Sequence, residues 1–147
     1  MKVFITEKSE SIFKRIVNLV SQIDGIEILK VEEKALSAID SIRTLKPDVI
    51  LLDMYLLGGT GKDVLMNIKN MNPVSKIILM IDQPFEGYRT NLKKIGADFV
   101  FNKSLEFEKI VPTLIKLMGK VSEEAPFSNN RNKRNTVEDK KYVKDGK

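Results

Sequence analysis

The chain has 147 residues, of which 42% are apolar and 31% are charged, as expected for a soluble protein with one domain. It contains no cysteine and no histidine, which excludes disulfides, thiolate chemistry, His-based catalytic triads and His metal sites. No apolar run approaches the roughly 20 residues that a membrane span needs, and no secretory signal core is visible, so we expect a cytoplasmic protein.

The net charge of +5 is unevenly distributed along the chain. Residues 120–147 hold eight Lys or Arg against five Asp or Glu, whereas residues 1–119 hold 17 against 15. Because the compact part is nearly neutral, the basic balance gives little support for nucleic-acid binding. Residues 120–147 are polar and lack periodicity, which predicts a flexible tail that is too short and too polar for a helix-turn-helix domain.

Five short apolar segments alternate with five segments of helical periodicity. In chain order the pattern predicts a strand at 2–6, a helix from the N-cap Ser9 to Ile23, a strand at 26–31, a helix at 32–45, a strand at 49–52, a helix at 62–70, a strand at 76–81, a helix at 87–95, a strand at 99–101 and a helix at 105–118. Pro112 falls near the start of the last helix. Alternation with short connections favours a doubly wound parallel sheet.

The clearest functional signal lies in residues 47–61. Val49 to Leu52 are four consecutive apolar residues, which predict a strand buried on both faces, and this strand ends on Asp53. A loop with three glycines follows. Ligands of open α/β sheets bind just outside the carboxyl ends of the strands, so Asp53 is a candidate site residue. The alternative is that Asp53 only caps or turns the chain.

The carboxyl ends of the neighbouring predicted strands also carry charged residues. They present Glu7 with Lys8, Ile81 with Asp82, and Lys103. A carboxylate among acidic and basic neighbours suits phosphate and metal chemistry. A lysine beside a phosphoryl acceptor would also stabilise the charge that develops during transfer.

Over about residues 1–119 the chain resembles the receiver domain of bacterial two-component response regulators, the CheY-like superfamily. The resemblance rests on the Leu-Leu-Asp strand end, on the Gly-Ala-Asp…Lys spacing and on the segments 2–9, 47–53, Gly61 and 96–104. It implies a flavodoxin-like α/β fold, in which five helices surround a five-stranded parallel sheet of strand order 2-1-3-4-5.

The resemblance implies a role for each matching residue. Asp53 falls on the phosphoacceptor aspartate, and Lys103 falls on the lysine that pairs with the phosphoryl group. A Mg²⁺ ion would be held by Glu7, Asp53 and the backbone carbonyl of Tyr55. The family also implies a cis peptide bond between Lys103 and Ser104, where proline is the commoner second residue.

Three positions depart from the family pattern. Lys8 replaces the second of two adjacent acids, and an ammonium repels a divalent cation, which predicts that magnesium binding is weak or absent. Ile81 (Met80 if the loop differs by one residue) takes the place of a Thr or Ser whose hydroxyl binds the phosphoryl group. Val100 takes the place of the aromatic residue that moves with this hydroxyl.

The departures allow two readings of the site. In the simpler one, Lys8 points to solvent and Ile81 only fills the core. In the other, the Lys8 ammonium occupies the place of the metal beside Asp53 and, together with Lys103, keeps that carboxylate ionised. The second reading predicts a degenerate receiver with one fixed conformation.

Two functions follow from the resemblance. The first is phosphorelay signal transduction, in which Asp53 accepts a phosphoryl group although the metal and switch residues are impaired. The second is a phosphorylation-independent pseudo-receiver that binds proteins through the face formed by segments 87–95, 99–101 and 105–118. A flavodoxin-like cofactor binder is disfavoured, because no Gly-rich phosphate loop follows the first strand.

The expected partners are a sensor histidine kinase or phosphotransfer protein and a downstream protein target. We expect no enzyme activity and no direct contact with nucleic acid or membrane. We also expect a monomer or a weak homodimer.

Overall fold

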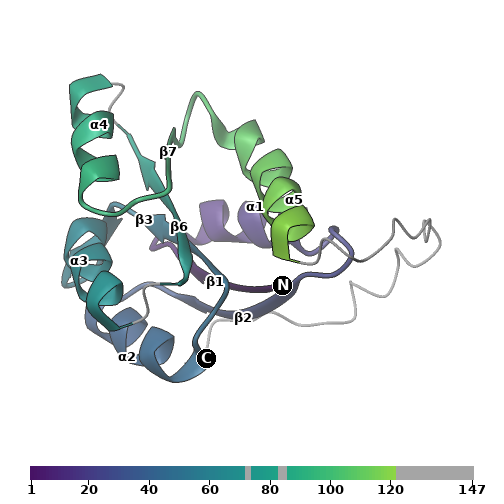
Figure 1. The fold of residues 1–147 in the computed structure, drawn as a ribbon, viewed down its shortest axis with the longest axis horizontal. Coiled ribbons are helices and arrows are strands. Elements are labelled where there is room, and N and C mark those ends of the chain that lie inside the picture. Colours follow the sequence, from purple (N-terminus) through teal and green to yellow (C-terminus); the bar gives the residue numbers. More distant parts are fainter. Residues whose placement is uncertain (72–73, 83–85, 122–147) are drawn as a thin grey trace.

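The computed structural model describes residues 1–71, 74–82 and 86–121 (Figure 1). Five parallel strands form one sheet in the order β2-β1-β3-β6-β7. The strands are β1 (Lys2–Thr6), β2 (Glu27–Glu32), β3 (Val49–Asp53), β6 (Lys76–Ile81) and β7 (Phe99–Asn102), and a separate two-stranded hairpin consists of β4 (Tyr55–Leu56) and β5 (Gly59–Thr60). The helices are α1 (Glu10–Val20), α2 (Ala35–Leu45), α3 (Gly61–Met71), α4 (Glu86–Lys94) and α5 (Ile110–Val121), with a 3₁₀ turn, η1 (Phe107–Lys109), before α5.

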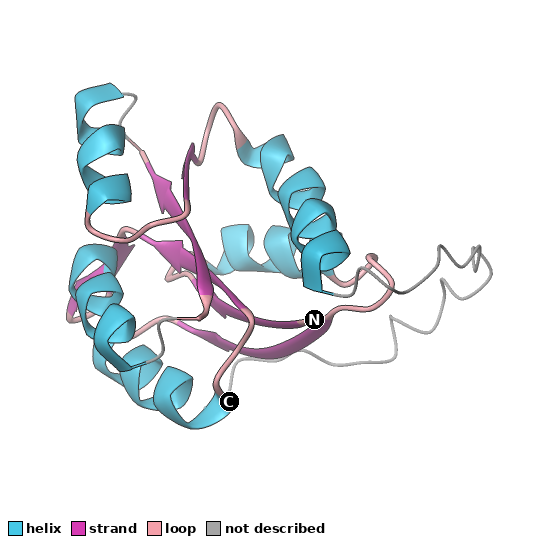
Figure 2. Ribbon diagram, viewed as in Figure 1, coloured by secondary structure: helices cyan, strands magenta, loops and turns pink. Residues whose placement is uncertain are grey.

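The helices cover both faces of the sheet (Figure 2). One apolar cluster joins one face of the sheet to α2, α3 and α4, and a second joins the other face to α1 and α5. The central strand β3 is buried along its whole length, because it packs against helices on both sides. The predicted flavodoxin-like α/β fold and its strand order are therefore confirmed.

The predicted segments agree with the observed ones except near their ends. The largest difference is at the last helix, which was expected to start at Leu105: that segment begins with the 3₁₀ turn η1, and α5 starts at Ile110. The helix expected at 32–45 starts at Ala35. Glu32 is instead the last residue of β2. Its side chain accepts hydrogen bonds from the backbone N–H groups of Glu33 and Lys34 at 3.1 Å, and this local turn delays the helix.

The hairpin β4–β5 lies in what the sequence suggested was only a glycine-rich loop. It is followed by a capping box, in which the Thr60 backbone N–H donates to the Asp63 carboxylate at 3.0 Å and the Asp63 N–H donates to the Thr60 hydroxyl at 3.1 Å. This cap starts α3 at Gly61, whose N–H donates to the Met54 carbonyl at 2.6 Å. The start of α3 is thereby fixed against the end of β3.

The expected domain of residues 1–119 ends within α5, which continues to Val121. The predicted tail lies outside the described residues, apart from Lys120 and Val121. Among the described helices none has both the length and the apolar character that are needed to cross a bilayer.

We predict that Gly61→Ala lowers the free energy of unfolding by about 1–3 kcal/mol, because a Cβ there would collide with the Asp53 carbonyl oxygen and the Met54 backbone. Gly87→Ala in α4 is the matched control, since a Cβ at that position meets no atom within 4 Å. Urea unfolding monitored by circular dichroism measures both. A Gly61→Ala variant as stable as Gly87→Ala would contradict the close approach of α3 to β3.

Candidate functional site

Three charged side chains meet at the carboxyl edge of the sheet, as the parallel topology requires. The Lys103 Nζ atom lies 3.1 Å from Asp53 Oδ1 and 3.2 Å from Glu7 Oε2. Glu7 directly follows β1, Asp53 ends β3, and Lys103 directly follows β7. The sequence therefore correctly placed these three residues at one edge.

The Asp53 backbone is fixed by a residue that the sequence did not single out. The Thr6 hydroxyl accepts a hydrogen bond from the Asp53 N–H at 3.0 Å and donates to the Leu51 carbonyl at 3.3 Å. The Tyr55 N–H lies 3.4 Å from Asp53 Oδ1. Both Thr6 and Asp53 are buried, so the two bonds of the Thr6 hydroxyl form away from competing water.

The Glu7 carboxyl is fully buried. Burial, and secondarily the nearby Asp53 charge, raise its pKa from 4.5 to about 7, although Lys103 and the Ser9 N–H act in the opposite direction. Glu7 therefore changes protonation near neutral pH. With Glu7 protonated, the ammonium of Lys103 balances the single charge of Asp53.

Burial alone would lower the pKa of Lys103, but the Asp53 and Glu7 carboxylates outweigh burial and raise it. The lysine is therefore a firmly charged ammonium. Two buried oxygens, Glu7 Oε1 and Asp53 Oδ2, have no hydrogen-bond partner among the described residues. Unpartnered carboxylate oxygens in a buried position favour a proton, a cation or covalent attachment of an electrophile.

Lys8 does not lie where the second reading of the sequence expected it. Its side chain is exposed and forms no hydrogen bond or ion pair with any residue in the described part of the chain. The ammonium beside Asp53 is that of Lys103. Lys8 directly follows the buried Glu7, and its long side chain extends into water instead of toward the carboxylates.

The peptide bond between Lys103 and Ser104 is trans, because no cis bond occurs among the described residues. The implied cis bond is therefore wrong for this chain. The turn is instead held by Asn102, whose side-chain oxygen accepts hydrogen bonds from the N–H groups of Ser104 and Leu105, both at 2.9 Å.

Ile81 and Val100 are both about 1% exposed and belong to the same apolar cluster, on the side of α2, α3 and α4. Their side chains can only pack, since neither carries a polar atom. Phe99 and Phe101 pack against the opposite cluster, as their alternation with Val100 predicts. The side chains at positions 81 and 100 are thus joined to the site by packing alone.

We predict that Glu7 makes the protein less stable as pH rises from about 4.5 to 7. Because its pKa is raised in the folded state, the folded chain binds more protons than the unfolded chain in this window, so the free energy of unfolding falls there. Glu7→Gln should remove this decline and be more stable than the wild type at pH 8 by on the order of 1–3 kcal/mol.

The control for that experiment is Glu108→Gln, which changes an exposed acid. Urea unfolding at pH 5 and pH 8 gives the comparison for the three proteins. If the difference between the two pH values were the same for Glu7→Gln and wild type, Glu7 would not titrate in the expected window.

Comparisons with known proteins agree with this fold. A family model described as "Response regulator receiver domain" matches residues 3–115. Chemotaxis protein CheY of Listeria monocytogenes is 24% identical over 116 residues, which are 79% of this chain and 97% of that protein. Response regulator GacA of Pseudomonas syringae is 21% identical over 114 residues, which are 78% of this chain and 53% of GacA.

A third relative is a protein-glutamate methylesterase/protein-glutamine glutaminase of Desulfotalea psychrophila, which is 27% identical over 103 residues. The match covers 68% of this chain but only 28% of the methylesterase. The chain thus spans about half of GacA and about a quarter of the methylesterase.

Solved structures show the same fold. A DNA-binding response regulator of the LuxR family from Staphylococcus aureus superimposes with a TM-score of 0.70 at 26% identity, covering 78% of this chain and 96% of that one. A two-component response regulator of the LuxR family from Aurantimonas has a TM-score of 0.74 at 15% identity, covering 81% and 85%. On the family match over residues 3–115, the chain belongs to the response regulator receiver domain family of two-component signal transduction.

Proposed function

We propose that this receiver domain accepts a phosphoryl group on Asp53. The observation that carries the proposal is the state of the Asp53 carboxylate, in which Oδ1 is paired with Lys103 while Oδ2 has no partner among the described residues. Oδ2 is the nucleophile of the proposed reaction. The proposed phosphoryl donor is a phosphohistidine of a sensor kinase or a phosphotransfer protein, and it lies on another protein because this chain has no histidine.

In the proposed step, Asp53 Oδ2 attacks the phosphorus atom, the P–N bond to the donor imidazole breaks and a P–O bond forms. The product is an acyl phosphate on Asp53, and the imidazole leaves with the electron pair of the broken bond and takes up a proton. The Lys103 ammonium, already within 3.1 Å of Asp53, offsets the negative charge that accumulates. The chain then acts as a signalling protein, not as an enzyme, on a downstream protein target.

Magnesium fits this site only in part. Glu7 and Asp53 offer the two unpartnered carboxylate oxygens, and the Tyr55 carbonyl would be the third protein ligand. No group of three acidic, His or Cys side chains suited to a metal occurs among the described residues. When bound, the ion would neutralise phosphoryl charge. We propose weak binding, because residue 8 is a lysine instead of an acid.

A second candidate function is that of a pseudo-receiver that binds its partner without phosphorylation. Two observations favour it. Asp53 is only 1% exposed, so a phosphoryl donor needs local movement to reach it. Ile81 and Val100 offer no polar atom that could respond to a phosphoryl group. The same partner face, α4 with β7 and α5, would then be used in one fixed state.

Acetyl phosphate separates the two candidates. We expect the wild type, in millimolar Mg²⁺, to gain the mass of one phosphoryl group, and Asp53→Asn to gain none. Lys103→Met should slow the gain by about 10²-fold, as loss of one charge-stabilising donor does. Glu108→Gln, which changes an exposed acid of η1, is the control and should react like wild type. No mass gain by wild type over a wide range of magnesium concentrations would favour the pseudo-receiver.

We expect Lys8→Asp to bind Mg²⁺ at least about tenfold more tightly than wild type, because a further carboxylate beside Glu7 replaces a repelling charge. Lys94→Asp on α4 carries the same change of charge at an exposed position and should leave magnesium binding unchanged. Titration followed by the amide resonances of Asp53 and its neighbours measures both. Tight binding to wild type, unaltered by Lys8→Asp, would contradict the role assigned to residue 8.

A further inference from the structure

The loop that carries Lys103 is closed on itself by two reciprocal hydrogen bonds. The Glu106 N–H donates to the Asn102 carbonyl at 2.8 Å, and the Asn102 N–H donates to Glu106 Oε1, also at 2.8 Å. The Lys103 N–H donates to the Ile81 carbonyl at 2.8 Å. Residues 102–106 therefore form a compact unit, and Glu106 supplies the side chain that closes it.

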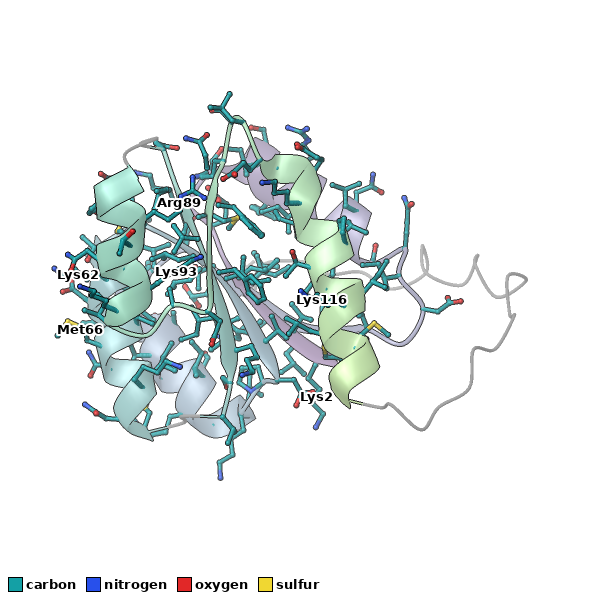
Figure 3. All side chains as sticks on the ribbon, turned by 45° about the horizontal axis from the view of Figure 1, so that its top comes forward. Lys2, Lys62, Met66, Arg89, Lys93 and Lys116 are labelled. Atoms are coloured by element: carbon teal, nitrogen blue, oxygen red, sulfur yellow. The ribbon has the colours of Figure 1, made fainter. Side chains whose placement is uncertain are left out.

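The same carboxylate binds α4. Arg89 of α4 donates from Nη1 to Glu106 Oε1 at 3.0 Å and to the Val100 carbonyl of β7 at 2.7 Å. Figure 3 shows Arg89 between α4 and β7. Lys109 donates to the other oxygen, Oε2, at 2.9 Å. One carboxylate thus joins the Lys103 loop to a helix that is separate in sequence.

Glu106 is held as a carboxylate. Burial acts to raise its pKa, but the bonds from the Asn102 N–H, Lys109 and Arg89 outweigh burial and lower the pKa to about 2. Arg89 and Glu106 side chains are 17% and 18% exposed, so water screens their interaction only in part. The link between the two is therefore a charge-assisted bond that persists at neutral pH.

We propose that Glu106 is a positioning residue for the Lys103 ammonium, and that Arg89 makes this position depend on where α4 lies. At positions 81 and 100 the side chains only pack, whereas the carboxylate of Glu106 makes a polar link between the Lys103 loop and α4. A protein that binds α4 and a group bound at Asp53 then influence each other, since such coupling is reciprocal. The influence on a phosphoryl group rests on the proposed function, whereas the coupling of α4 to the loop does not.

Amide exchange in the ¹⁵N-labelled full chain, without a phosphoryl donor, tests the coupling. In Arg89→Met we expect the Asn102 amide to exchange about tenfold faster and the Lys103 amide resonance to shift. Arg89→Lys keeps a cation for Glu106 and should restore most of the protection. Lys94→Met, an exposed cation of the same helix, should change neither. Conversely, Lys103→Met should shift the Arg89 side-chain N–H resonance.

The proposal is overturned if the effects of Arg89→Met stay within α4, or if Lys94→Met produces the same effects. If Arg89→Met does not fold, the coupling is tested with Arg89→Lys, through the Asn102 and Lys103 amides, and with Lys103→Met, through the Arg89 side-chain N–H. A second experiment measures the reaction with acetyl phosphate. Arg89→Met should react more slowly by on the order of tenfold, which is less than the roughly hundredfold that a 1 Å misplacement of a reacting group can cost. A wild type that gains no phosphoryl group would refute the proposed function and leave the exchange result to decide the coupling.

Discussion

The site depends on the burial of two carboxylates and one ammonium at the edge of a parallel sheet. With both carboxylates ionised this group carries one uncompensated negative charge in a buried position, which is energetically costly. Burial, and secondarily the Asp53 charge, raise the pKa of Glu7 to about 7 for this reason, so a proton on Glu7 balances the charge at slightly acid pH. A proton and a cation are alternative ways to neutralise the same pair of oxygens, Glu7 Oε1 and Asp53 Oδ2.

The rest of the local structure keeps these three groups together. Thr6 holds the Asp53 backbone, the close approach of Gly61 places the start of α3 against the end of β3, and the closed loop 102–106 presents Lys103. Each device lies on a strand end or on a short capped turn, where backbone groups without ladder partners would otherwise be unsatisfied. Charge burial at the site is thus supported by hydrogen bonding around it.

Ile81 and Val100 make only packing contacts, whereas Arg89 and Glu106 form an ion pair, and the two kinds of contact respond differently to a change. Packing resists small displacements, because a dense core has few alternative arrangements. The Arg89–Glu106 ion pair joins two specific groups, and it is lost when either charge is removed. The Arg89–Glu106 bond and the loop that Glu106 closes are the link that we propose between α4 and the site.

Much of the fold and the three central charges could be predicted from the sequence. Buried apolar strands and helical periodicity are local signals, and parallel topology brings strand ends to one edge, so Glu7, Asp53 and Lys103 were placed correctly. The direction of a side chain depends on its tertiary surroundings, and one of the two readings of the sequence therefore put the ammonium of Lys8 beside Asp53, whereas Lys8 is exposed. Arg89 and Glu106 were missed because they lie 17 residues apart and no periodicity relates them. The sequence indicated for Thr6 only that it belongs to the first strand, not that its hydroxyl binds the Asp53 backbone.

The central claim is that the Lys103 ammonium is the charge that makes burial of both carboxylates tolerable, and a double-mutant cycle tests it most directly. Urea unfolding at pH 8 would compare wild type, Lys103→Met, Asp53→Asn and the double variant. We predict that Lys103→Met costs about 3–5 kcal/mol in the wild-type background, as loss of one partner of a buried ion pair does. In the Asp53→Asn background the cost should be smaller by at least about 1 kcal/mol. Additive effects, within about 0.5 kcal/mol, would contradict the account.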